Sequence, residues 1–148
     1  PLFIRLGNPG LLPELTHRFG GGFRQFNPLN FTNLWAGMNY TFTENAFVYA
    51  RDIDSKRITS ITPTNISGTQ SIWANLDFGF PIRKNKFTIN TGYNFNYNKG
   101  FTLINSLQDD ITTFGHGFNL RINLTPIDQF SFFLNGGARF SGQNCSLN

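Results

Sequence analysis

The feature of this chain that most constrains its fold is an alternation of apolar and polar residues with a period of two. Residues 71–81, 86–99, 112–125 and 129–141 each place apolar or aromatic side chains at every second position, with polar or small residues between them. Successive side chains of a β-strand point to opposite faces, so this pattern predicts strands with one apolar and one polar face. The sequence therefore predicts four long strands in succession.

Two earlier segments, residues 16–26 and 30–42, show the same alternation less regularly, because Trp35 interrupts the polar positions of the second one. After residues 43–45 the apolar phase moves to Phe47 and Tyr49. We interpret this change as a bulge, or as the point where the strand leaves a bilayer.

The connections alternate between short and long. Residues 26–30, 81–85 and 125–128 are rich in Pro and Asn, which predicts tight turns, whereas residues 52–70 and 102–111 are predicted to be longer polar loops. Outer-membrane β-barrels have short periplasmic turns and longer extracellular loops, and each of their tilted strands needs about 9–11 residues to span the bilayer. The predicted strands reach that length.

Composition separates this fold from its soluble alternative. The chain has 148 residues, of which 39% are hydrophobic and only 14% charged, and it contains 18 Phe. No run of about 18 apolar residues exists, so a transmembrane helix is not expected. A soluble β-sandwich also alternates, but its strands average about five or six residues. We therefore predict an all-β fold, an antiparallel up-and-down transmembrane β-barrel.

The predicted barrel is incomplete. About six strands are too few to close a transmembrane barrel, because the smallest known have about eight. We expect residues 1–148 to form one partial barrel domain, with any signal peptide, N-terminal plug and terminal strands outside this stretch.

Charge and reactive residues argue against several functions. The net charge is +4, but the basic residues are scattered, so no nucleic-acid partner is expected.

The single Cys145 cannot form an internal disulfide. Residues 20–22 are three glycines without the Lys and helix of a phosphate-binding loop, and His17 and His116 have no ligand-spaced neighbours and are expected near strand ends. Asp109 and Asp110 are expected to form a solvated turn. We expect no catalytic, cofactor or metal site, and no enzyme.

The alternation assigns side chains to the two faces of the wall. The polar positions, predicted to face the lumen, are Asn75, Asp77, Asn90, Asn94, Asn96, Asn119, Arg121, Asn123, Asn135 and Arg139. The apolar positions, predicted to face lipid, are Ile72, Leu76, Phe78, Phe87, Ile89, Tyr93, Phe95, Phe118, Leu120, Ile122, Phe130, Phe132 and Leu134. An Arg facing lipid at mid-depth would cost about 2–4 kcal/mol, which supports this orientation. Parity places Tyr40, Tyr93 and Tyr97 in an aromatic girdle; Trp73 belongs either to the girdle or to a contact with a plug.

A more specific signal lies near the N-terminus, in the segment formed by Gly7, Asn8, Pro9, Leu11, Pro13 and Glu14. It resembles the G-N-P-x-L-x-P-E segment of TonB-dependent receptors, where it precedes a strand that descends from the outer surface. The usual basic residue before the second proline is Leu12 here. The whole chain resembles the TonB-dependent-receptor-like outer-membrane barrels of the Bacteroidetes.

The resemblance implies a plugged barrel of about 22 strands and a wall segment of a receptor for nutrient uptake. It also implies its partners: outer-membrane lipid, the TonB energy-coupling protein acting through a plug outside this stretch, and, as a further candidate, a surface lipoprotein. Two alternatives remain open, a passive porin-like or structural outer-membrane barrel and a soluble carbohydrate-binding β-sandwich.

Overall fold

The computed structural model describes residues 2–84, 86–127 and 129–146, and the described part contains nine strands. No helix in it is long and apolar enough to cross a membrane. The strands are β1 (Leu2–Arg5), β2 (Leu15–Asn27), β3 (Thr32–Glu44), β4 (Ala46–Ile53), β5 (Ile58–Ile66), β6 (Thr69–Arg83), β7 (Phe87–Ile104), β8 (Leu107–Ile127) and β9 (Phe130–Ser146).

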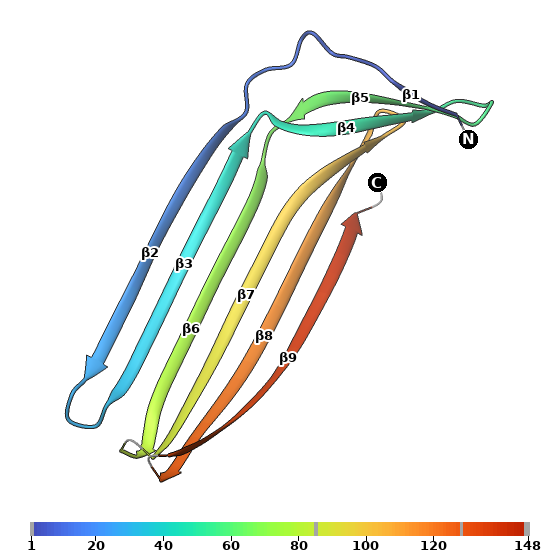
Figure 1. Cartoon of the computed structure of the whole chain (residues 1–148). Coiled ribbons are helices and arrows are strands. Elements are labelled where there is room, and N and C mark those ends of the chain that lie inside the picture. Colours follow the sequence, from blue (N-terminus) through green and yellow to red (C-terminus); the bar gives the residue numbers. More distant parts are fainter. Residues whose placement is uncertain (1, 85, 128, 147–148) are drawn as a thin grey trace.

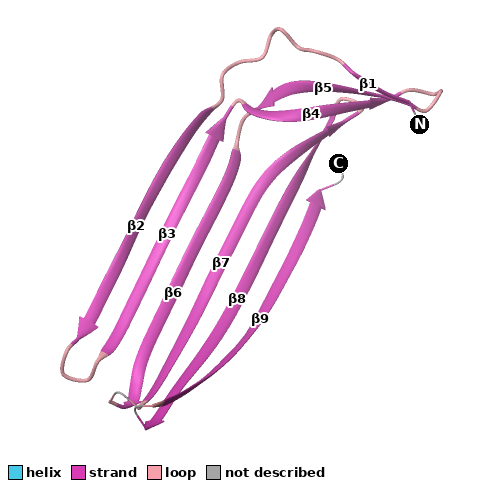
Figure 2. Ribbon diagram, in the orientation of Figure 1, coloured by secondary structure: helices cyan, strands magenta, loops and turns pink. Residues whose placement is uncertain are grey.

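Six long strands of 13 to 21 residues form the body of the sheet, and they correspond to the six predicted segments. They pair antiparallel in the order β2-β3-β6-β7-β8-β9, so consecutive long strands are neighbours (Figures 1 and 2). This is the up-and-down order predicted from the alternation. The sheet does not close, because β2 and β9 pair on only one side within the described residues.

The short turns all lie at one end of the sheet, as expected. The β2–β3 turn occupies residues 28–31, and Phe31 takes a left-handed conformation there with φ of 58°. Residues 85 and 128, within the second and third predicted turns, lie outside the described residues. At this end β6 and β8 each carry a register shift, between Pro81 and Arg83 and between Leu124 and Ile127.

The predicted polar loop at residues 102–111 is wrong. β7 and β8 continue as a paired hairpin to a two-residue turn at Asn105 and Ser106, whose φ angles of 51° and 63° are both positive. Two positive φ angles define the type I′ turn, whose twist matches that of the flanking strands. Polar residues such as Asp109 therefore lie in a strand that extends beyond the body of the sheet.

The predicted loop at residues 52–70 is also largely wrong, because it contains most of a second hairpin. The strand is interrupted at Asn45, where φ is 53°, and beyond it β4 turns away from the direction of β3 and pairs with β5. β4 also pairs in parallel with the upper end of β7, at Ala50 with Leu103, and β5 pairs in parallel with β1. The β4–β5 hairpin consequently lies across the upper ends of the long strands (Figure 1). The change of phase therefore coincides with a break between two strands at Asn45 and not with a bulge inside one strand. That the strand leaves a bilayer at this point stays a prediction.

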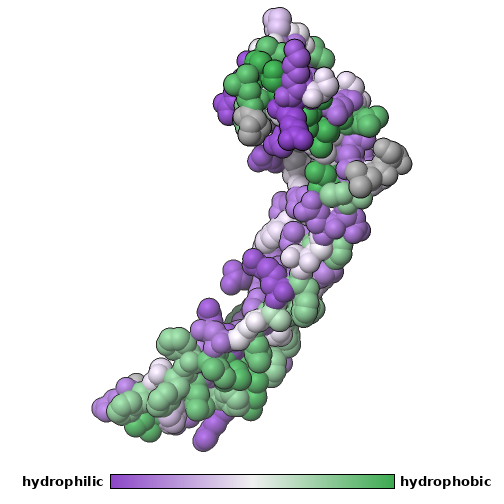
Figure 3. All heavy atoms as spheres, turned by 90° about the vertical axis from the view of Figure 1, so that its right-hand side faces the viewer, coloured by the Kyte–Doolittle hydropathy of each residue, from purple (hydrophilic) through white to green (hydrophobic). Residues whose placement is uncertain are grey.

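The sheet has almost no conventional core. Ala46 is the only buried hydrophobic residue in the described part, and many large apolar side chains are exposed, among them Phe19, Phe118, Phe132 and Leu134. Hydrophobic spheres gather over the lower part of the strands, and hydrophilic ones are frequent toward the other end (Figure 3). A sheet one layer thick with such a face needs an apolar surrounding.

Candidate functional site

The register of the sheet divides the long strands into two chemically distinct faces. Asp77, Gly92, Asn119 and Gly137 are cross-strand partners in one row and therefore share a face. The same pairing and alternation place all ten candidate lumen residues on this polar face, and all thirteen candidate lipid residues on the opposite, apolar face. Which face meets lipid stays a prediction.

The apolar face has the height of a bilayer core. On β7 its band runs from Phe87 to Tyr97, and on β8 from Phe114 to Leu124. At about 3.3 Å per residue each segment is ~33 Å long, and a tilt of about 40° reduces this to about 25 Å. That is about the height of the apolar band in outer-membrane barrels.

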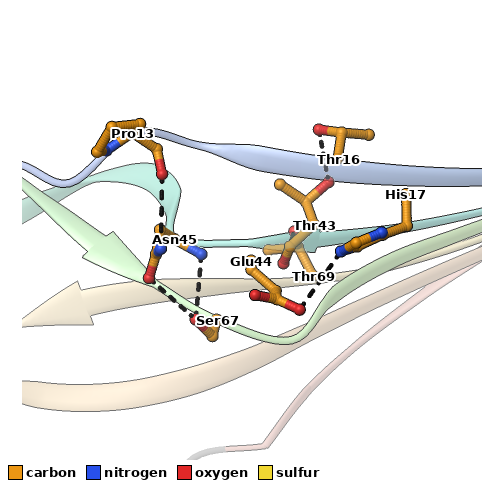
Figure 4. Close-up of polar contacts among 8 residues, drawn as sticks. All are labelled: Pro13, Thr16, His17, Thr43, Glu44, Asn45, Ser67 and Thr69. Carbon is orange, nitrogen blue, oxygen red and sulfur yellow. Dashed lines mark hydrogen bonds and ion pairs between the residues drawn. The ribbon is translucent and has the colours of Figure 1, made fainter.

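Polar pairs mark the upper limit of this band. His17 Nε2 lies 3.4 Å from Glu44 Oε1 (Figure 4), and Lys99 Nζ lies 3.0 Å from Asp110 Oδ2. Gln70 is the register partner of Lys99 on the same face. Charged side chains therefore begin on this face where the hairpins rise above the body of the sheet. Asp110 is in an ion pair within a strand, not in the solvated turn that the sequence suggested.

One of the two histidines lies inside the apolar band. His116 is near the middle of β8, so the expectation that both histidines lie near strand ends is wrong for this one. The error arose because β8 extends through the segment predicted as a loop. The hydroxyl of Tyr93 is hydrogen-bonded to Nδ1 of His116 at 2.7 Å, and the rings of Phe95 and Phe114 contact the imidazole. A partner for the ring nitrogen lowers the cost of placing a histidine there.

On the polar face, asparagine side chains lie over glycines of the neighbouring strand. A Cβ at Gly79, Gly92 or Gly115 would lie 2.5 to 2.7 Å from an amide of Asn90, Asn119 or Asn96, respectively. Gly37 has the same relation to Asn75 on β6, at 2.7 Å. Glycine therefore provides the space that each amide occupies. A sheet that curls toward one face crowds the side chains on that face, so these glycines are consistent with a concave polar face.

A hollow of about 440 Å³ lies on the polar face. Its lining includes one carboxylate, one guanidinium and four side-chain amides, which belong to Asp77, Arg121, Asn33, Asn90, Asn119 and Asn135. Asn75 donates to the Asp77 carboxylate at 3.0 Å, and the Nε of Arg121 donates to Asn135 at 2.9 Å. Both charged groups are thus held in place by one amide each.

A second hollow, of about 600 Å³, adjoins the first at Asn33, which lines both. Its other lining residues include Arg24, Phe26 and Trp35. Trp35 pairs with Arg24 on one side and with Asp77 on the other, so the two hollows follow neighbouring rows across the strands. The alternation placed Trp35 on the polar face but did not show that it lines a hollow. Trp73 lies on this same polar face, with Asn39 and Asn96 as its partners.

The segment of residues 7–14 attaches the chain to the β4–β5 hairpin. The Asn8 side chain donates to the Pro63 carbonyl oxygen at 3.0 Å, and its own Oδ1 accepts from the Gly10 amide at 2.9 Å. The Glu14 carboxylate accepts from the backbone N–H of Phe47 at 3.4 Å. Gly7, Pro9, Leu11 and Pro13 complete the connection between β1 and β2.

Two asparagines that the sequence did not single out complete this attachment. Asn65 accepts from the Leu12 amide at 2.7 Å and donates to the carbonyl oxygens of Leu12 and Asn45, at 3.0 and 2.7 Å. The Asn45 side-chain amide donates to the Pro13 carbonyl oxygen at 3.5 Å, and the Asn45 backbone N–H donates to the Ser67 hydroxyl at 3.1 Å (Figure 4). The Ser67 hydroxyl in turn donates to the Asn45 side-chain oxygen at 3.4 Å. Local sequence carries no signal for these contacts, because they join residues that are 20 to 53 positions apart.

No group of three or more His, Cys, Asp or Glu side chains gathers as a metal site within the described ranges. Gly20, Gly21 and Gly22 lie in the middle of β2, and Cys145 is exposed near the end of β9. The polar face with its two hollows is therefore the strongest candidate for a functional surface.

Comparison with known proteins agrees with this architecture. The model of a family described as "Outer membrane protein beta-barrel family" matches residues 1–147. No curated protein and no solved structure matches the chain. The match spans all nine strands, and the family's description accounts for the two-faced sheet. The chain belongs to the outer membrane protein β-barrel family.

Proposed function

We propose that this chain is a wall segment of a TonB-dependent outer-membrane receptor that takes up a nutrient. The observation that carries the proposal is the polar face, where charged groups and amides line two adjoining hollows. A wall that served only as structure would not need hollows lined by charged groups held by neighbouring amides. In a barrel, residues on the lumen side tune which solutes are accepted.

The width of the sheet supports a large barrel. Six long strands lie side by side without closing, and the outer edges of β2 and β9 carry no partner within the described part of the chain. Unpaired strand edges are not tolerated in the hydrocarbon core, so in a bilayer these edges need further strands. A barrel of many strands encloses a lumen wide enough for a plug or a large solute.

The segment of residues 7–14 supports the receptor class within such barrels. Its resemblance to the TonB-dependent motif covers Gly7, Asn8, Pro9, Leu11, Pro13 and Glu14. Asn8 and Glu14 donate to or accept from the β4–β5 hairpin, which stands at the end opposite the short turns. That end is the outer surface if the short turns are periplasmic. The motif therefore has a structural purpose consistent with its place in that family, namely to hold an outer hairpin.

We also propose that the chain has no enzymatic role. The proposal rests on the lining of the hollows, in which a nucleophile with an adjacent base is not found among the described residues. The partners follow from the receptor proposal: lipid on the apolar face, TonB through a plug, and a lipoprotein at the outer hairpins.

The test is the electrical behaviour of the full-length protein in a planar lipid bilayer. A plugged receptor is expected to show no steady conductance until mild urea displaces the plug, after which large channels open. Uptake of its nutrient by cells should also stop when a protonophore collapses the inner-membrane gradient. Steady conductance without urea, together with uptake that ignores the protonophore, would establish a passive pore instead.

A further inference from the structure

We propose that the two adjoining hollows of the polar face bind an acidic oligosaccharide, with Trp35 as its stacking platform and Arg24 and Arg121 as partners for its carboxylates. The inference rests on the proposed function, because it places this ligand in the path of the transported solute. Its class follows from three features of the hollows: a supported aromatic ring, an excess of guanidinium groups, and a dense set of amides.

The first feature is the support under the Trp35 ring. Atoms Cη2 and Cζ3 of the indole lie 2.9 and 3.4 Å from where a Cβ of Gly22 would be, and Cζ2 lies 3.4 Å from that of Gly37. The six-membered ring thus spans two glycines on neighbouring strands and lies against the sheet. Trp35 remains 42% exposed. An exposed indole supported by backbone offers a flat surface to the apolar face of a sugar ring.

The second feature is an excess of positive charge. Arg18, Arg24, Arg121 and Arg139 are on the polar face of the long strands. Two carboxylates share this face among the described residues: Asp77 in the body of the sheet, and Asp109 in the part of β8 that extends beyond it. None of the four arginines forms an ion pair with a described carboxylate. A confined surface with an excess of one charge concentrates solutes of the opposite charge, and arginines in this position favour anions.

The third feature is the supply of partners for hydroxyl groups. Asn33, Asn90, Asn119 and Asn135 each present an amide that both donates and accepts, and Asp77 adds an acceptor beside the platform. A polyhydroxylated ring needs many such partners. Because the Asp77 carboxylate repels any anion, Asp77 is expected to accept from hydroxyl groups of the ligand, and the ligand's carboxylates are expected to lie toward Arg24 and Arg121.

The size of the groove favours an oligomer over a single sugar. Arg24 is on β2 and Arg121 on β8, which are four strand spacings apart. At about 4.8 Å per spacing, the backbones of the two arginines are about 19 Å apart across the strands, and Trp35 and Asp77 lie between them. A single ring cannot contact both arginines, whereas a short acidic chain can.

The experiment measures binding by isothermal titration calorimetry to the full-length protein in detergent at low ionic strength. The probes are tetragalacturonate, the neutral maltotetraose, and uridine monophosphate. We expect tetragalacturonate to bind more tightly than maltotetraose by about tenfold or more. Trp35→Ala should weaken binding of the acidic probe by about tenfold, whereas Trp35→Phe should retain most of it. Arg24→Gln with Arg121→Gln should remove the preference for the acidic probe.

A matched pair of glycine variants separates the platform from general effects on folding. Gly22→Ala displaces the Trp35 ring and should weaken binding, whereas Gly21→Ala, on the opposite face with no atom within 4 Å of its Cβ, should not. Equal binding of the acidic and neutral probes, tighter binding of uridine monophosphate, or no effect of Trp35→Ala would overturn the inference.

The outcome is independent of energy coupling. If the acidic probe does not bind, but the channel is closed and uptake is sensitive to the protonophore, the oligosaccharide proposal is rejected and the receptor proposal stands. If the acidic probe binds, but the barrel conducts steadily, the receptor proposal is rejected and the proposed ligand class stands.

Discussion

The side-chain amide of Asn96 on β7 lies over Gly115 on β8, with its oxygen 2.6 Å from the position that a Cβ at residue 115 would take. The two residues are register partners on the polar face. The same contact between an asparagine amide and a glycine is repeated across the sheet. This repeated contact explains why a strand-forming sequence contains so many Asn and Gly residues, which are normally depleted in strands.

The first prediction concerns this contact between Asn96 and Gly115. Gly115→Ala places a methyl group against the Asn96 amide and should destabilise the folded barrel by about 1–2 kcal/mol through overpacking. Gly136→Ala, whose Cβ would meet nothing within 4 Å, should change stability by less than about 0.5 kcal/mol. Urea unfolding of the full-length protein in lipid vesicles measures both. Equal effects of the two substitutions would show that the amide does not need the glycine.

The second prediction tests the orientation of the wall. Single cysteines in a Cys145→Ser background are compared as neighbouring pairs: Asp77 with Phe78, Asn94 with Phe95, and Arg121 with Leu120. The polar member of each pair should react with a water-soluble maleimide, and the apolar member with a lipid-soluble probe, because alternate side chains point to opposite faces. Reaction in the reverse pattern would exchange the lumen and lipid faces.

The third prediction concerns His116 and Tyr93. Tyr93→Phe removes the only hydrogen-bond partner of the His116 ring among the described residues, inside the apolar band, and should cost about 1–2 kcal/mol. Because His116→Leu removes the unpaired group itself, adding it to Tyr93→Phe should recover most of this loss. A double-mutant cycle of urea unfolding in vesicles measures the coupling. Additive effects of the two substitutions would mean that the hydrogen bond contributes nothing.

The fourth prediction concerns the attachment of the β4–β5 hairpin. Asn8→Ala and Asn65→Ala each remove side-chain hydrogen bonds between this hairpin and residues 8–12, and together they should loosen it. Hydrogen exchange over residues 46–66 should accelerate about fivefold or more in the double variant, as expected for a loss of about 1 kcal/mol. Ser55→Ala, in the turn of the same hairpin, serves as the control. Unchanged exchange in the double variant would contradict the role assigned to the motif.

The six long strands could be predicted because their signal is local. Alternation in 86–99 or 112–125 depends on each residue's own face and needs no knowledge of its partner. The same local pattern assigned Asp77 and Phe78 to opposite faces, and the register of the sheet places them so.

The outer hairpins could not be predicted in this way. Pro63 in β5 and the two aspartates of β8 are typical of loops, yet both strands form because of partners that the local pattern does not reveal. The hollows depend on register as well: Arg24, Trp35 and Asp77 come from three strands, and only cross-strand pairing puts them in one row.

The parallel pairing of Ala50 with Leu103 has a consequence for how the chain folds. The β4–β5 hairpin can form by itself, since its strands are adjacent in sequence. The part of β7 that pairs with β4, however, lies more than 50 residues further along the chain. Contacts of such separation form slowly, because the intervening chain must first lose its conformational freedom. Docking of this hairpin therefore follows assembly of the β6–β7 pair, and until then the exposed edge of β4 is open to pairing with other chains.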